Sequence, residues 1–217
     1  MVDGAMIRSK TKTKRGDCRR LGWLLLPVLL GACTGLQPAP ADNVNTYVLE
    51  ARPLASVAQR RQGIVLEVSA PRAWPGFETP QMAYVRRPYE LDYFATNRWA
   101  DTPSRMLGPL LARALEQTGS FRAVLLTPSA VPADVRVVSE LVRLQQNFEA
   151  RPSRVELTLR MQLIDVRGQR VLATRLFDET ENTSSDDAYG GVTAANLALQ
   201  RTLEQVANFC IVESGTR

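Results

Sequence analysis

A short apolar run that ends in small residues and a cysteine sets where a folded domain can begin in this chain. The run covers residues 21–30 and is followed directly by Gly31, Ala32 and Cys33. Its length of about ten residues is far below the roughly 20 that a membrane-spanning helix needs, and Pro27 interrupts it. The run is therefore not expected to be a permanent transmembrane anchor.

The position of the cysteine decides between the remaining interpretations of this run. A secretory signal without lipid has the same layout of charged start, apolar core and small-residue cleavage site. A buried core helix is disfavoured because residues 34–42 (TGLQPAPAD) contain two prolines and a glycine. Cysteine directly after small residues is typical of a bacterial lipobox. We predict cleavage between Ala32 and Cys33, with Cys33 carrying diacylglycerol and an N-acyl chain such as palmitate, and no other cofactor.

This cleavage changes the apparent charge of the protein. The whole chain has a net charge of +5, which by itself would suggest a nucleic-acid or anionic partner. Residues 1–32 contain seven basic and two acidic side chains, and subtracting them from the totals of 27 and 22 leaves 20 of each. The mature chain is therefore neutral, and we expect no nucleic-acid partner. The start codon, Met1 or Met6, stays open.

We expect three segments: a signal peptide at 1–32, a lipidated N-terminus and flexible tether at 33–45, and one domain at 46–213. Alternating apolar and polar residues predict β-strands in that domain, most clearly at 155–163, where one face is expected to be buried. A phase shift within 133–148 predicts a bulged long strand, and Arg167-Gly168 predicts a hairpin turn into 171–181. Shorter strands are expected at 46–50, 64–70, 82–86, 89–94 and 121–126.

Two amphipathic helices complete the expected fold. The first starts at the cap Thr102 and Pro103, with Pro109 predicting a kinked or irregular first turn. The second is capped by Asp186 or Asp187 and carries an apolar stripe that packs on the sheet or, alternatively, forms a coiled-coil seam. The fold class is therefore α/β (α+β), a single domain with a mixed β-sheet and two main helices packed on it.

Half of the aromatic residues gather between residues 74 and 99. We expect them either to pack in the core and across strands, or to form an exposed apolar surface for a partner protein or a lipid. The candidates for that surface are Trp74, Phe77, Tyr84, Tyr89, Tyr93 and Phe94.

The side chains that most often carry catalysis are scarce. Histidine is absent, which excludes Ser-His-Asp and Cys-His chemistry and histidine metal ligands. Acidic residues at 178–181 and 186–187 could serve an acid/base or calcium site, but their Thr/Ser/Asn-rich surroundings favour turn and capping roles. Cys210 is expected to be a buried apolar residue, with a reactive thiol as the alternative. We predict a protein that is not an enzyme, with no catalytic residues and no metal site.

Several local motifs occur in a fixed order along the chain. They are the lipobox ending at Cys33, Tyr47-Val48-Leu49, Tyr89-Glu90-Leu91, the run Arg98-Trp99-Ala100-Asp101, and Gly119-Ser120-Phe121. With these features the chain resembles the ABC-type transport auxiliary lipoprotein family over residues 33–212. The resemblance implies an outer-membrane lipoprotein that serves MCE-domain (paraquat-inducible type) intermembrane phospholipid transport, with no catalytic residues to assign.

The resemblance also implies partners and a location. They are an MCE-domain periplasmic protein, an ABC permease and ATPase, the membrane through the lipid anchor, and, as candidates, phospholipid and further copies of the chain. Thr34, rather than Asp, after Cys33 implies the outer membrane, with the domain facing the periplasm. Arg98, Trp99, Ala100 and Asp101 are expected to be structural, with an Arg98–Asp101 pair above a packed Trp99. The alternative function is an assembly or pilot lipoprotein for another cell-envelope complex.

Overall fold

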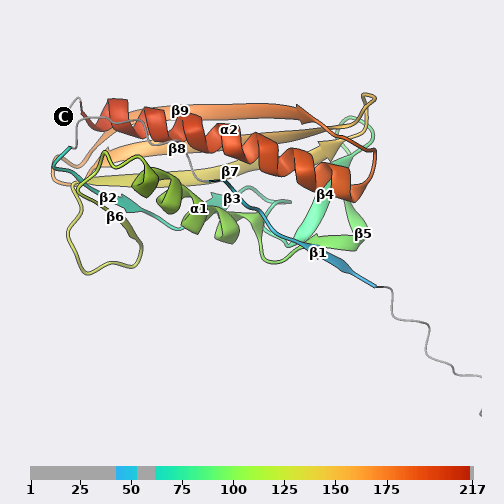
Figure 1. Cartoon of the computed structure of the whole chain (residues 1–217), viewed down its shortest axis with the longest axis horizontal. Coiled ribbons are helices and arrows are strands. Elements are labelled where there is room, and N and C mark those ends of the chain that lie inside the picture. The colour runs from blue at the N-terminus through green and yellow to red at the C-terminus, as the bar shows by residue number, and fades with distance from the viewer. Residues whose placement is uncertain (1–42, 53–61, 216–217) are drawn as a thin grey trace, which may run out of the picture. The chain divides into compact units, whose positions relative to one another are not determined.

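The structure, a computed structural model, describes residues 43–52 and 62–215 (Figure 1). The predicted cleavage site, the lipidated Cys33 and most of the tether lie outside the described residues. Within them, neither helix has a stretch long and apolar enough to cross a membrane.

A long central strand organises the sheet. This strand, β7 (Val135–Asn147), pairs along one side with β8 (Arg154–Asp165) in antiparallel fashion, and β9 (Arg170–Asn182) continues the sheet beyond β8. On its other side β7 pairs in turn with β2 (Val65–Val68), β3 (Arg72–Ala73) and β4 (Gln81–Val85), all parallel to it. Three strands from one continuous stretch, residues 65–85, thus pair with the same side of β7.

Three further strands extend the sheet beyond β2 and β4. Strand β6 (Ala123–Leu126) pairs in parallel with β2, and β5 (Asp92–Trp99) pairs in antiparallel fashion with β4. The short β1 (Asn45–Tyr47) then pairs in parallel with β5. The sheet is mixed, as expected.

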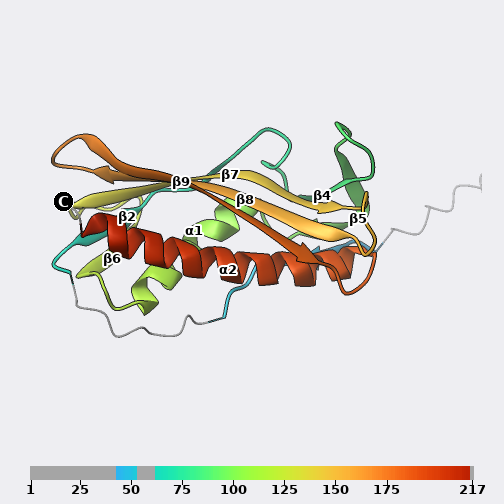
Figure 2. The same cartoon turned by 90° about the horizontal axis from the view of Figure 1, so that it is seen from above.

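Both helices lie on one face of this sheet, and no described helix covers the other face, called the open face below (Figure 2). Helix α2 (Ala188–Ser214) covers β8 and β9, and α1 (Pro103–Gln117) lies beside it over β2, β3 and β6. The expected single α+β domain with two helices on a mixed sheet is confirmed. The core lies between the two layers and includes Leu66, Leu111, Leu141, Leu159 and Leu203, all fully buried.

The clearest sequence patterns are confirmed. In β8 the apolar residues from Val155 to Leu163 face the helices and are buried. The register of β7 against β8 shifts between Leu141 and Arg143, which is the predicted bulge. The side chain of Asp187 caps α2 by accepting a 2.7 Å hydrogen bond from the backbone N–H of Gly190.

Two local predictions are wrong. The strand expected at 89–94 begins only at Asp92, because Tyr89 adopts a positive φ of 66° that extended strands exclude. The irregular first turn of α1 is absent, since the helix runs without a break through Pro109. Pro109 and Arg105, whose carbonyl loses its partner, both lie on the exposed side, where water can satisfy that carbonyl.

Side chains of α2 hold the N-terminal segment in place. The backbone N–H groups of Glu50 and Arg52 donate to Asn196 (2.8 Å) and Gln200 (2.9 Å). The chain therefore enters the domain along α2.

Candidate functional site

Two loops project from the open face of the sheet, opposite the helices (Figure 2). One covers residues 74–80 between β3 and β4, and the other covers residues 86–91 between β4 and β5. They expose large apolar side chains: Trp74 is 49% exposed and Tyr89 is fully exposed. Such side chains on loops held by a sheet are typical of an interaction surface. We call residues 74–80 and 86–91 the two-loop surface.

Specific contacts fix the two loops to each other. The hydroxyl of Tyr93 donates a 2.9 Å hydrogen bond to the carbonyl of Gly76. Gly76 has a φ of +92°, and a Cβ there would lie 2.9 Å from a methyl carbon of Leu91, so the close approach of the loops requires glycine. These contacts therefore hold in place the loops that carry the exposed aromatic side chains.

An ion pair closes the second loop. The guanidinium of Arg87 donates to both carboxylate oxygens of Glu90, at 2.6 and 2.9 Å. This hydrogen bond lowers the pKa of Glu90 from its ordinary value and raises that of Arg87. Both groups are solvent-exposed, so the pair shapes the loop and contributes little to global stability.

An open groove of about 580 Å³ lies between the second loop and the sheet. Its wall is mostly apolar and its floor consists of polar and charged side chains of β7 and β8. The wall residues are Phe77, Val85, Pro88, Tyr89, Leu91 and the charged Glu90, and the floor residues include Arg143, Gln145, Asn147, Arg154 and Glu156.

Glu156 is the centre of the groove floor. It is only 8% exposed, and its carboxylate accepts hydrogen bonds from Asn147 (2.9 Å), Gln145 (3.1 Å), Arg143 (3.1 Å) and Arg154 (3.2 Å). Burial alone would raise its pKa, but the hydrogen bonds from Asn147, Gln145 and Arg143 outweigh burial and lower it. A carboxylate that is ionised and saturated with donors is a structural anchor and a poor general base.

The six aromatic candidates divide between the two faces of the sheet. Trp74, Phe77 and Tyr89 belong to the two-loop surface, and Tyr93 braces it from below. Tyr84 and Phe94 instead contact each other and Phe148, with ring centroids 4.8 to 6.3 Å apart. Alternation along β4 and β5 places this cluster on the helix-covered face.

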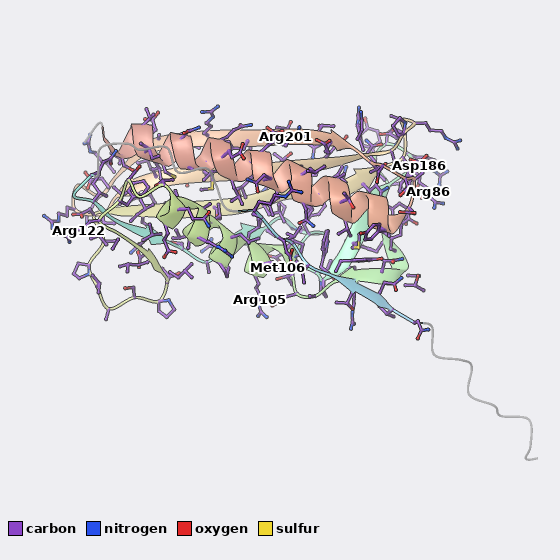
Figure 3. All side chains as sticks on the ribbon, viewed as in Figure 1. Arg86, Arg105, Met106, Arg122, Asp186 and Arg201 are labelled. Carbon is purple, nitrogen blue, oxygen red and sulfur yellow. The ribbon has the colours of Figure 1, made fainter. Side chains whose placement is uncertain are left out.

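Arg86 covers the edge of this second aromatic cluster. Its guanidinium lies 5.0 Å from the ring centre of Tyr84 and 5.9 Å from that of Phe148. Figure 3 shows Arg86 at the same end of the molecule as Asp186, which accepts a 2.7 Å bond from the N–H of Ser153. Arg86 and Asp186 thus both lie at the end of the domain where the second aromatic cluster ends.

The motif at residues 98–101 joins β5 to α1, and its expected internal ion pair is wrong. Trp99 is 4% exposed and packs in the core as predicted. Arg98, however, donates to Thr46 on β1 (3.4 Å), and Asp101 lies 3.7 Å from Arg105 in the first turn of α1. Arg98 lies in β5 and contacts β1, whereas Asp101 directly precedes Thr102, the N-cap of α1, and contacts the helix.

The other acidic side chains singled out above have structural partners. Asp178 accepts from Thr158 (2.6 Å), and Glu179 and Glu181 pair with Arg201 of α2. Within residues 43–52 and 62–215, no group of three or more His, Cys, Asp or Glu side chains could hold a metal ion.

Cys210 is fully buried in the core, as expected. Burial raises the pKa of its thiol to about 12. A thiol in this state is a packing group and a poor nucleophile.

The groove floor is not among the sites that the sequence predicts. Alternation in β8 places Glu156 on the polar face, but its donors Arg143, Gln145 and Asn147 come from β7. The phase shift in β7 is the one sequence signal for these donors. After the bulge every second residue, 143, 145 and 147, points to the same face of the sheet.

Comparisons with known proteins agree with this fold. Residues 47–207 match the family model described as "ABC-type transport auxiliary lipoprotein component". No curated protein matches the chain. The crystal structure of protein XCC0632 from Xanthomonas campestris, which carries the family label DUF330, is 21% identical with a TM-score of 0.73 over 79% of this chain and 98% of that chain. A second crystal structure, of an uncharacterized protein, is 12% identical with a TM-score of 0.61 over 76% of this chain and 97% of that one. These two likenesses show the fold.

Proposed function

The chain belongs to the family of ABC-type transport auxiliary lipoprotein components, and on this premise we propose that it is a non-catalytic accessory of an intermembrane phospholipid transport system of the MCE type. In this proposal Cys33 is lipidated, the anchor lies in the outer membrane and the domain faces the periplasm. The family match across residues 47–207 is the observation that carries the proposal.

The described residues support an accessory role over a catalytic one. The most buried carboxylate of the groove, Glu156, is already held by four donors, and the thiol of Cys210 is protonated and fully buried. Neither group is prepared for nucleophilic or acid/base work. The functional feature that the domain offers is an exposed surface for binding.

The two-loop surface is the proposed docking site for a periplasmic protein of the transport system. Trp74 and Tyr89 supply the large, rigid aromatic side chains that most often dominate protein interfaces. Because Gly76, Leu91 and Tyr93 brace the loops, little conformational entropy is lost when a partner binds.

A gentle-detergent purification of the full chain tests this proposal, with mass spectrometry of the bound proteins and lipids. We expect an MCE-domain protein or its permease in the eluate, and its loss in the Cys33→Ala variant. A preparation that instead carries an unrelated envelope complex contradicts the transport role and favours a pilot lipoprotein.

The same assay locates the docking surface. The double variant Trp74→Ala/Tyr89→Ala should reduce partner recovery at least tenfold, because two anchors of about 1–2 kcal/mol each are removed. The matched control is Val131→Ala/Val212→Ala, which also truncates two exposed apolar side chains, 52% and 62% exposed, outside the two loops. Equal recovery with both double variants would contradict the assignment of this surface.

A further inference from the structure

The outer edge of β9 is a long sheet margin that no other described strand pairs with. Across the part of the chain that the structure describes, β9 pairs only with β8, over twelve registered positions. Figure 1 shows β9 along one margin of the sheet, and Figure 2 looks onto that margin. Its 13 residues leave a row of backbone donors and acceptors available to another strand.

Among the described residues, the other end strands of the sheet are much shorter. They are β1, with three residues, β6, with four, and β3, with two. Short strands are one way in which proteins protect a sheet edge; proline and charged side chains, lysine above all, are others. β9 is long and contains no proline or lysine, and its charged residues are Arg170, Arg175, Asp178, Glu179 and Glu181. It also exposes Leu176, which is 56% exposed in the middle of the strand.

We propose that β9 pairs in antiparallel fashion with β9 of a second copy of this chain, around a two-fold axis that passes between the two Leu176 residues. The pairing joins two sheets into one through an isologous contact, in which the same strand serves both copies. This inference does not rest on the proposed function.

The side chains of β9 favour this register on the open face of the sheet. Residues whose numbers add up to 352 face each other, so Leu176 contacts Leu176 of the second copy and loses part of its contact with water. Thr174 faces Asp178 of the second copy, where a hydroxyl can donate to a carboxylate. No like charges are set opposite each other in β9.

The helix-covered face supports the same register. Arg175 contacts the ring of Phe177 at 5.1 Å, and among the described residues it has no acidic partner. In the dimer it lies opposite Phe177 and diagonal to both Glu179 and Arg175 of the second copy, and its long side chain can turn toward the carboxylate and away from the like charge. Glu179 is already oriented by Arg201, which Figure 3 shows on α2 against β9.

Neighbouring registers are less favourable. An axis at Arg175 or at Asp178 would set two like charges opposite each other, which destabilises strand pairing. An axis at Phe177 would set Arg175 directly opposite Glu179, but it would also set the exposed Leu176 against the carboxylate of Asp178. The axis at Leu176 is therefore the register that pairs the exposed leucines with each other and sets no like charges directly opposite each other.

Cysteine cross-linking of the full chain in detergent tests the register. Opposite residues of antiparallel strands have Cα atoms about 4.5–5.5 Å apart, which suits a disulfide. We expect Leu176→Cys to form a disulfide-linked dimer under mild oxidation. Cys210 is buried in the core and does not interfere.

Two further cysteine variants are the matched controls. Thr174→Cys and Asp178→Cys alone should not form dimers, because identical residues there lie about 13 Å apart along the strands. A mixture of the two variants should form a mixed disulfide. Linkage of Thr174→Cys to itself, or no linkage of Leu176→Cys above the rate of Val212→Cys, overturns the proposal.

The mass of the protein–detergent particle gives an independent measurement. We expect a dimer for the unchanged chain and a monomer for Leu176→Lys, while Val212→Lys, on the exposed side of α2, remains a dimer. All three should give the same circular dichroism spectrum, which shows that the fold is intact. A monomeric unchanged chain, or cross-linking of β9 to a different protein without self-linkage, overturns pairing between copies.

Discussion

Replacing Trp99 by alanine should destabilise the domain strongly. The side chain is 4% exposed and fills the space between β4, β7 and α2, where it lies near Met82, Leu144 and Ala195. Truncating a buried tryptophan costs about 3–5 kcal/mol, because transfer free energy is lost and a cavity remains. In a domain of this size each kcal/mol lowers Tm by roughly 2–4 °C, so we expect Tm to fall by on the order of 6–20 °C.

The measurement is thermal unfolding of the full chain, followed by circular dichroism. Trp74→Ala is the matched control, because it removes the same side chain from a site that is 49% exposed. The free energy of unfolding should then change by less than about 0.5 kcal/mol, and Tm by no more than about 2 °C.

Two results would refute the reasoning. If Trp99→Ala left Tm unchanged but removed partner binding, the residue would act as a contact and not as core. If Trp74→Ala lowered Tm as much as Trp99→Ala, the two-loop surface would belong to the hydrophobic core and would not be an exposed binding surface.

Three more predictions follow from single side chains. Because the folded pKa of Glu156 lies below its ordinary value of 4.5, its carboxylate stabilises the fold fully above that pH, and this contribution is lost as pH falls through the folded pKa. Urea unfolding should therefore show Glu156→Gln less stable than the unchanged chain at pH 7 and closer to it in acid; a gap that widened in acid would contradict this. The thiol of Cys210 should not react with a maleimide at pH 8 unless urea unfolds the protein, since its pKa is about 12; rapid labelling of the folded chain would contradict its burial. Gly76→Ala should cost roughly 1–2 kcal/mol and weaken partner capture, because the new methyl group meets Leu91 in a left-handed conformation; an unchanged Tm would show that the loop needs no glycine.

The candidate site could be predicted only in part from the sequence. The cluster of aromatic residues between 74 and 99 indicated an interaction surface, and Trp74 and Tyr89 are indeed exposed. Sequence could not separate them from Tyr84 and Phe94, which turn to the helix-covered side. The positive φ of Tyr89 interrupts the regular alternation of side chains between the two faces, so the sequence pattern could not assign each aromatic side chain to a face.

The sequence by itself determined the local elements of this protein. The alternation in β8, the bulge in β7 and the cap at Asp187 depend on residues a few positions apart, so their patterns are readable in one dimension. The tertiary structure alone decided which elements meet. Glu156 accepts hydrogen bonds from side chains of β7, Arg98 donates to Thr46 at a separation of 52 residues, and one edge of β9 pairs with no other strand of the described residues. The physical reason is that strand neighbours are selected by the burial of whole faces against α1 and α2, a property that no short stretch of sequence contains.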